Sequence, residues 1–222
     1  MQTNTQVVRR NGFTKTELLL VLGICLVLGG LLASAVGKVR ETAARVSCAY
    51  KLKQLGAGMQ HYHAAHNSLP PALRRSGPGT RCYRPSCNLN IPNSLPSEPG
   101  LKWWTELLEP YVENRNVFHC PRGTTSGYAM NGVDGGPAGM NLGSIWNGTS
   151  QVVLTFEHEG RWPICAYRLP PTGALVPWPF SAHDANRHYA DRHGQEFLAL
   201  FCDGHVSALT TRDLKAAHFY AH

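Results

Sequence analysis

Residues 12–36 read GFTKTELLLVLGICLVLGGLLASAV, and no position from Leu18 to Val36 carries a charged side chain. An α-helix needs about 20 predominantly apolar residues to cross the hydrocarbon core of a bilayer. The residues before this stretch are polar and basic, and they end in Arg9-Arg10-Asn11-Gly12. The sequence therefore predicts one membrane-spanning helix near the N-terminus.

Two kinds of N-terminal signal fit this pattern. A secretory signal peptide is cut at small residues beyond its apolar core, and Ala33-Ser34-Ala35 offers such a site. The other signal lies before the core, where Glu17 opens the apolar stretch. A carboxylate at membrane depth is costly, and cleavage after Gly12 would supply a partner, the free amine of Phe13. The helix dipole also favours an acidic residue at this end, so charge alone leaves both explanations of Glu17 open.

The order of these residues resembles the class III signal of type IV pilins and pseudopilins. Gly12 precedes Phe13-Thr14, and Glu17 would be the fifth residue of the mature chain, directly before a Leu-rich span. The resemblance implies that prepilin peptidase cleaves between Gly12 and Phe13 and methylates Phe13, and that Glu17 serves in assembly.

The same resemblance implies a location and a set of partners. The chain would be a single-pass inner-membrane protein with its globular head in the periplasm, reaching the cell surface or an extracellular filament after assembly. Its partners would be the membrane, other pilin-like subunits in a homo- or hetero-oligomer, and an inner-membrane assembly platform.

The helical pattern continues beyond the apolar stretch. Gly37-Lys38 marks the predicted membrane edge, and no proline occurs before Pro70. Apolar and aromatic residues then recur at helical spacing at Cys48, Leu52, Leu55, Met59, Tyr62 and His66. We expect one helix from about Phe13 to Asn67, in which Gly29-Gly30 and Gly56-x-Gly58 allow bends.

The pattern divides the chain into four parts. We expect a leader at 1–12, the transmembrane half of the helix at 13–37, its amphipathic half at 38–67, and a periplasmic head at 68–222.

A second resemblance lies in the amphipathic half and at the C-terminal end. The run CAYKLKQLG at 48–56, with His61-Tyr62-His63 and Leu69-Pro70-Pro71-Ala72, is similar to a large bacterial pilin-like family, domain of unknown function 1559. That family is named for a C-terminal His-x9-Asp-Gly motif. His193 and the pair Asp203-Gly204 supply the motif in this chain.

The head is predicted to hold a small sheet. Strands are expected at 151–156, 196–202 and 205–209, and Asp203-Gly204 between two β-prone runs is a strong hairpin signal. Residues 102–108 read as a short helix closed by Pro110. The expected fold is α+β and pilin-like, with the long N-terminal helix packed on a small antiparallel sheet.

Seven cysteines are many for a cytosolic chain of 222 residues. Cys25 lies in the apolar stretch, and the other six fit an oxidising compartment such as the periplasm. Cys82 and Cys87 are close enough in sequence to close a small loop. Six cysteines allow fifteen pairings, and the sequence does not choose among them. Because no Cys-x-x-Cys occurs, a zinc ribbon or a thioredoxin-type site is disfavoured.

Charge and motifs limit the other function classes. The net charge of +7 comes without a dense basic run, so specific nucleic-acid binding is not predicted. The residues that suggest metal chemistry are His183, Asp184, His188, Asp191, His193, Asp203 and His205. They lack the spacing of a zinc hydrolase, so we do not expect an enzyme or a required cofactor. Asp184, Asp191 and Asp203 offer oxygen ligands for a calcium ion.

Three functions remain at this point. The favoured one is a pilin-like structural subunit of a type IV pilus-like or type II secretion-like filament. The alternatives are a membrane-anchored binding module that uses the region from Cys82 to Trp104, and a metal-dependent periplasmic enzyme.

Overall fold

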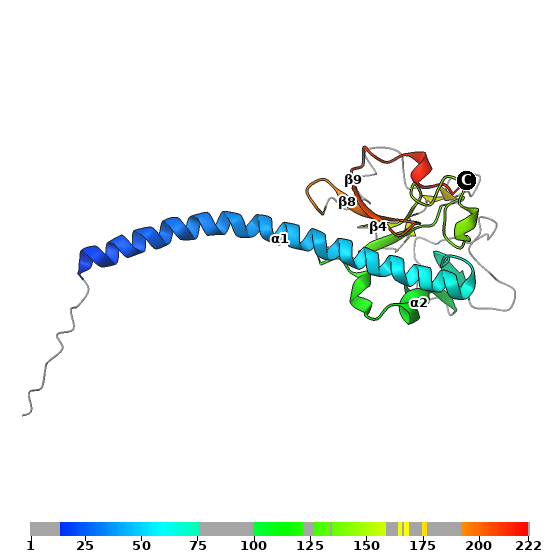
Figure 1. Cartoon of the computed structure of the whole chain (residues 1–222), viewed down its shortest axis with the longest axis horizontal. Coiled ribbons are helices and arrows are strands. Elements are labelled where there is room, and N and C mark those ends of the chain that lie inside the picture. Colours follow the sequence, from blue (N-terminus) through cyan, green and yellow to red (C-terminus); the bar gives the residue numbers. More distant parts are fainter. Residues whose placement is uncertain are drawn as a thin grey trace, which may run out of the picture. The chain divides into compact units, whose positions relative to one another are not determined.

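Figure 1 shows a computed structural model of the chain, which divides into two compact units, Met1–Ala43 and Ala44–His222. The structure describes residues 14–75, 100–121, 127–133, 135–158, 164–165, 167–168, 175–176 and 192–221.

One α-helix, α1, runs from Lys15 to His66 and confirms the long N-terminal helix. The helix ends where Asn67 adopts a left-handed φ of 54° and its N–H donates to the His63 carbonyl over 2.7 Å. Asparagine tolerates this conformation better than most residues and is therefore a common end to a helix. Pro70 follows shortly afterwards, and its lack of a backbone N–H prevents the helix from resuming.

A five-stranded sheet in the order β5-β3-β4-β8-β9 lies at the centre of the second unit. Its strands are β3 (Tyr128–Asn131), β4 (Val153–Glu157), β5 (Ile164–Cys165), β8 (Phe197–Phe201) and β9 (Val206–Leu209). The three predicted strands are β4, β8 and β9, which pair antiparallel with their neighbours. The short strand β5 lies parallel to β3, so the sheet is antiparallel except at this edge. The α+β fold class is confirmed.

Two further strand pairs and several short helices complete the described part of the head. The pairs are β1 (Leu73–Arg75) with β2 (Leu101–Trp103), and β6 (Tyr167–Arg168) with β7 (Leu175–Val176). The short helices are α2 (Trp104–Leu108) and the 3-10 helices η1 (Glu109–Tyr111), η2 (Arg115–Phe118), η3 (Leu142–Ser144) and η4 (Ala216–His218).

The predicted helix at 102–108 is wrong in its first two residues. Lys102 and Trp103 belong to β2, where they pair with Arg74 and Leu73. The Trp103 N–H then donates to the Glu106 carboxylate over 2.8 Å, so Glu106 caps the helix that starts at the next residue. Strand pairing with a distant segment therefore shortens the helix.

The central strands bury both of their faces. Tyr128, Met130 and Leu154 belong to one apolar cluster, whereas Ala129 and Phe156 belong to a second cluster. Strand β8 alternates in the same way, with Leu198 and Leu200 in the first cluster and its phenylalanines in the second. Because successive strand side chains point to opposite faces, a continuous apolar run such as FLALF at 197–201 fits a strand covered on both sides.

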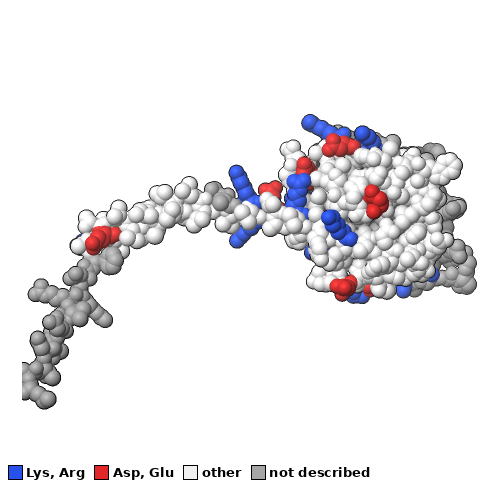
Figure 2. Space-filling view, viewed as in Figure 1, with Lys and Arg blue, Asp and Glu red and all other residues white. Residues whose placement is uncertain are grey.

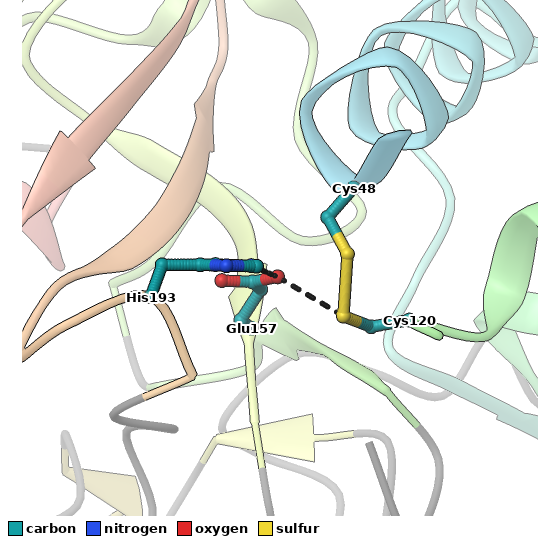
Figure 3. A group of neighbouring side chains, drawn as sticks. All are labelled: Cys48, Cys120, Glu157 and His193. Atoms are coloured by element: carbon teal, nitrogen blue, oxygen red, sulfur yellow. Dashed lines mark hydrogen bonds and ion pairs between the residues drawn. A yellow bond between two sulfur atoms is a disulfide. The ribbon is translucent and has the colours of Figure 1, made fainter. Parts of the chain in front are cut away.

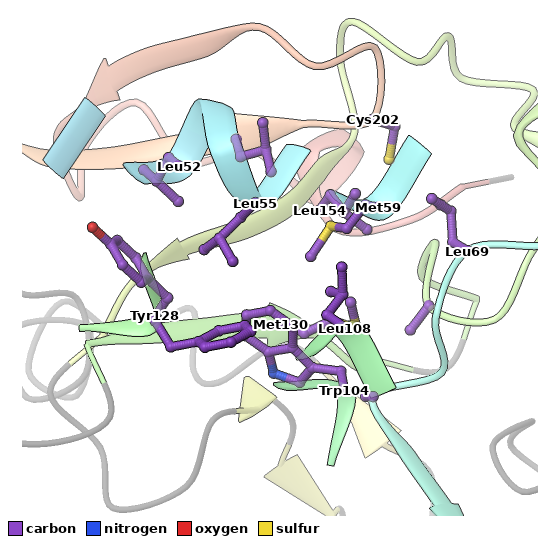
Figure 4. Close-up of a cluster of buried hydrophobic side chains, with 14 of the residues drawn as sticks. Leu52, Leu55, Met59, Leu69, Trp104, Leu108, Tyr128, Met130, Leu154 and Cys202 are labelled. Atoms are coloured by element: carbon purple, nitrogen blue, oxygen red, sulfur yellow. The ribbon is translucent and has the colours of Figure 1, made fainter. Parts of the chain in front are cut away.

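The C-terminal half of α1 covers one face of the sheet. Cys48, Leu52, Leu55 and Met59 are fully buried, and Figure 4 shows the last three facing Leu154 and the neighbouring core residues. The predicted helical stripe is thus confirmed over these positions, and burying each leucine contributes about 1.5–3 kcal/mol. The stripe does not extend to its last predicted member: His66 is exposed, and its Nε2 lies 3.0 Å from the Tyr111 hydroxyl.

Gly56 and Gly58 lie where α1 approaches other elements most closely. A Cβ atom on Gly58 would stand 2.8 Å from Val112 Cγ1 and 3.0 Å from Leu108 Cδ2, and one on Gly56 would stand 3.0 Å from Leu200 Cδ1. We therefore attribute these glycines to close packing; the bend that the sequence suggested stays a prediction.

The last residues of the chain are bound back into the head. The buried Asn131 side chain donates to the carbonyls of Val153 and Phe219 over 2.8 and 3.0 Å. The Ala221 N–H donates to the Gly135 carbonyl over 2.6 Å, and both Phe219 and Ala221 are buried. Phe219 thereby joins the second apolar cluster, and Ala221 joins the first.

Candidate functional site

Glu17 lies in the first turn of α1 and is held by Thr14. The backbone N–H and the hydroxyl of Thr14 each donate to Glu17 Oε2 over 2.8 Å, and the Glu17 N–H donates to the Thr14 hydroxyl over 3.3 Å. This reciprocal arrangement is a capping box. Glu17 therefore has local donors in the uncleaved chain. Gly12 and Phe13 lie outside the described residues, so the predicted pairing of Glu17 with a Phe13 amine stays a prediction.

The apolar stretch after Glu17 is exposed. Leu19 and Leu26 are 68% and 77% exposed, and all described side chains from Leu18 to Leu32 are exposed. Figure 2 shows this part of α1 as a surface almost without Lys, Arg, Asp or Glu. By length and composition the helix is able to cross a membrane as an anchor or to act as an N-terminal signal. None of the residues that the structure describes in the first unit covers this apolar surface.

His193, the first residue of the His-x9-Asp-Gly pattern, is buried against an acid that lies in the sheet. Its side chain is 1% exposed, and its Nε2 lies 3.0 Å from Oε1 of Glu157, which is 0% exposed. The other carboxylate oxygen of Glu157 accepts the backbone N–H of Leu198 over 2.9 Å. Burying a carboxylate without partners is costly, so these two donors allow Glu157 to lie at the end of β4.

A disulfide between Cys48 and Cys120 lies beside this pair (Figure 3). Cys48 belongs to α1, and Cys120 follows η2. Cys120 Sγ lies 3.4 Å from Glu157 Oε1, and the ligand atoms of all four residues lie within 4.8 Å of one another. The four side chains form one buried cluster, which we call the Cys-Glu-His cluster.

Two further polar groups surround the cluster. The buried Arg192 donates to the carbonyls of Gly127 and His158 over 3.0 and 2.6 Å. The Tyr128 hydroxyl donates to the Cys48 carbonyl over 3.3 Å. Burial, reinforced by the negative charge of Glu157, raises the pKa of Tyr128 far above its ordinary value, so Tyr128 remains a neutral hydrogen-bond donor.

The Asp203-Gly204 pair of the same pattern forms the turn between β8 and β9, as predicted. The Gly204 N–H donates to the Phe201 carbonyl over 3.0 Å, and the Phe201 N–H donates to the His205 carbonyl over 2.9 Å. The loop therefore contains Cys202, Asp203 and Gly204, and Gly204 has a φ of 91° that favours glycine. A loop of this length commonly combines a type I turn with a left-handed residue.

Asp203 closes this turn with its side chain. Asp203 Oδ1 accepts the His205 backbone N–H over 3.0 Å and lies 2.6 Å from His205 Nδ1. Partial burial raises the pKa of Asp203, but the hydrogen bonds and the charge of His205 outweigh it, so the pKa lies below its ordinary value. Asp203 thus serves the hairpin.

The residues suggested for metal chemistry do not share one site in the described part. His193 pairs with Glu157, whereas Asp203 pairs with His205. Asp184 and Asp191, like His183 and His188, lie outside the described residues, so the calcium site that would combine them with Asp203 stays a prediction. Cys82 and Cys87 also lie outside the described residues.

Sequence reasoning missed four contributors to these sites: Thr14, Glu157, Arg192 and the partnership of Cys48 with Cys120. The pattern Thr14-x-x-Glu17 is a capping-box signal and would have revealed the first. Glu157 is an acid at the end of a mostly apolar strand, and this position was a signal that its carboxylate has a buried partner. The disulfide partners are 72 residues apart, and no local pattern pairs them.

The class of protein that these observations define is an α+β protein with an exposed apolar N-terminal helix and an antiparallel sheet head. A family model described as a protein of unknown function (DUF1559) matches residues 37–120, which is less than half of the chain. The match begins at the predicted membrane edge and ends at Cys120, so it includes both cysteines of the disulfide. His193, Asp203 and Gly204 lie beyond it. Searches of curated proteins and of solved structures each found no match.

Proposed function

We propose that this chain is the precursor of a pilin-like structural subunit. Prepilin peptidase cleaves it between Gly12 and Phe13 and methylates Phe13. The apolar half of α1 then lies in the inner membrane with the head in the periplasm, and assembly buries this half among the same helices of other subunits in a type IV pilus-like or type II secretion-like filament.

The exposed apolar surface of α1 is the observation that carries the proposal. Side chains from Leu18 to Leu32 face outward in the single chain, and apolar surface of this extent is stable only in a membrane or against a partner. The C-terminal half of the same helix is a core element of the head. Loss of the whole apolar half by cleavage near Ser34 would discard a partner surface, whereas cleavage after Gly12 retains it.

The first experiment is mass spectrometry of the N-terminus of the mature protein purified from membranes. We expect a chain that begins at Phe13 and carries one methyl group on its amine. A chain that begins near Ser34 or Val36 would indicate a secretory signal and refute the proposal, as would a chain that is intact from Met1.

Two substitutions at Glu17 distinguish the role of its negative charge from its role in the capping box with Thr14. Glu17→Gln keeps an acceptor for the Thr14 N–H, because glutamine also forms capping boxes, but it removes the negative charge. Glu17→Ala removes both. If the carboxylate pairs with a Phe13 amine during assembly, both variants are processed normally and both fail to form filaments in electron micrographs. If Glu17→Gln assembles like the unaltered chain, Glu17 acts through the capping box alone.

A further inference from the structure

The Cys-Glu-His cluster has the donor set of a metal site. We propose that, when the Cys48–Cys120 disulfide is reduced, the two thiolates, Glu157 and His193 bind one Zn²⁺ ion inside the head. This inference is independent of the function proposed above, because it concerns residues of the second unit only.

The positions of the ligand atoms fit a tetrahedral ion. Zinc bonds of about 2.3 Å to sulfur and about 2.0–2.2 Å to nitrogen or oxygen place tetrahedral ligands roughly 3.3–3.8 Å apart. Glu157 Oε1 already lies 3.0 Å from His193 Nε2 and 3.4 Å from Cys120 Sγ. All ligand atoms lie within 4.8 Å of one another. The two sulfur atoms have to separate, and reduction of their bond allows this; the other ligand atoms reach tetrahedral spacing through shifts of about 1 Å or less.

The ligands are oriented by the elements that carry them. Cys48 lies on α1, Glu157 ends β4, and His193 precedes β8 (Figure 3). The Leu198 N–H holds Glu157 Oε2, which leaves Oε1 directed at His193 and Cys120. Hydrogen bonds to the second oxygen of a ligating carboxylate fix its orientation and tune the metal site.

The charges of the cluster balance in both states. In the oxidised form, Glu157 carries one negative charge and the buried Arg192 carries one positive charge. In the zinc form, the ion contributes two positive charges, and the two thiolates and Glu157 contribute three negative charges. Arg192 then brings the sum to zero. Buried charge is tolerated when it is balanced, and Arg192 provides that balance in each state.

The chemical steps are a reduction followed by an exchange of protons for metal. A dithiol reductant gives two electrons and two protons to the Cys48–Cys120 bond, which yields two thiols, and the reductant becomes a disulfide. Zn²⁺ then displaces the protons of both thiols, because thiolate is the form that binds metal. The ring proton of His193 moves from Nε2 to Nδ1 in the same exchange, which leaves the Nε2 lone pair for the ion. A site with two thiolates and one imidazole is chemically suited to zinc.

The test uses the full-length protein in detergent. The protein is reduced with dithiothreitol, the reductant is removed without oxygen, and Zn²⁺ is titrated against a competing chelator. We expect one tightly bound Zn²⁺ per reduced chain, and at least tenfold weaker binding by the oxidised chain. Co²⁺ in place of Zn²⁺ should give the intense visible absorption of a tetrahedral ion and a charge-transfer band from two thiolates.

Matched variants assign the site. Cys48→Ser and Glu157→Gln should each weaken Zn²⁺ binding at least tenfold, whereas Cys25→Ser and Cys202→Ser should not change it. The Co²⁺ spectrum of the unaltered chain tests the ligand set even if a variant fails to fold. The proposal is refuted if the reduced chain retains no stoichiometric zinc. It is also refuted if the oxidised chain binds as tightly, or if binding does not depend on Cys48 and Glu157.

Discussion

Replacing Gly58 with alanine tests whether close packing decides the sequence of α1. Alanine is favoured over glycine in a helix by about 0.8–1.0 kcal/mol, so propensity alone predicts that Gly58→Ala stabilises the head. The added Cβ, however, would lie 2.8 Å from Val112 Cγ1, 3.0 Å from Leu108 Cδ2 and 3.3 Å from the Tyr111 carbonyl oxygen. Val112 is β-branched and the Tyr111 atom belongs to the backbone, so neither moves away cheaply.

Overpacking of this kind costs about 1–3 kcal/mol. The cost exceeds the helix gain over most of this range, and we expect Gly58→Ala to lower the free energy of unfolding by about 0–2 kcal/mol. The assay is urea unfolding of the full-length protein in detergent under oxidising conditions, followed by near-ultraviolet circular dichroism. Trp104 is fully buried in the same cluster and reports on it.

Ala57 provides the matched control, because it is exposed and lies between the two packed glycines. Ala57→Gly should lower the free energy of unfolding by about 0.8–1.0 kcal/mol through helix propensity alone. That value measures the propensity contribution at this place in α1. If Gly58→Ala instead raises the free energy of unfolding by a similar amount, the close approach of α1 to Val112 and Leu108 is refuted.

Three other outcomes follow from groups in the head. Gly204→Ala should lower the free energy of unfolding by about 1–2 kcal/mol because Gly204 has a φ of 91°, and urea unfolding measures this; a neutral effect would contradict the turn geometry. Burial raises the pKa of the Cys202 thiol well above its ordinary value, so alkylation by iodoacetamide at pH 8 should be at least about 100-fold slower in the folded than in the urea-unfolded protein, as mass spectrometry can follow. Burial, with a smaller effect of Lys215, lowers the pKa of His218 below 6.5. As the pH drops, His218 therefore takes up a proton in the unfolded chain before it does so in the folded chain. The free energy of unfolding should then fall as the pH drops through 6.5 toward the native pKa. His218→Gln should remove that part of the pH dependence, and an unchanged slope would show that His218 does not cause it.

The elements that the sequence predicted best are those with a repeating local pattern. Leu52, Leu55 and Met59 recur at helical spacing, so the buried face of α1 follows from the sequence. The β8–β9 hairpin follows from Asp203-Gly204 because turn chemistry is also local. Both predictions depend on residues that lie within a few positions of one another.

The elements that the sequence did not predict depend on distant segments. Trp103 continues a strand because Leu73 pairs with it, and the short strand β5 is set by its parallel pairing with β3. The candidate zinc site also depends on distant segments. It joins Cys48, Cys120, Glu157 and His193, which no short motif connects. Composition indicated that the cysteines lie in an oxidising compartment, but only the fold selects Cys120 as the partner of Cys48.

The buried C-terminal segment has a practical consequence for work on this protein. Ala221 is fully buried and its N–H is bonded to Gly135, while Phe219 closes the second apolar cluster. An affinity tag fused directly after this segment would have to leave these positions undisturbed, so a flexible spacer is advisable. Truncation before Phe219 would uncover the far side of the sheet, and we expect such a shortened protein to aggregate during expression.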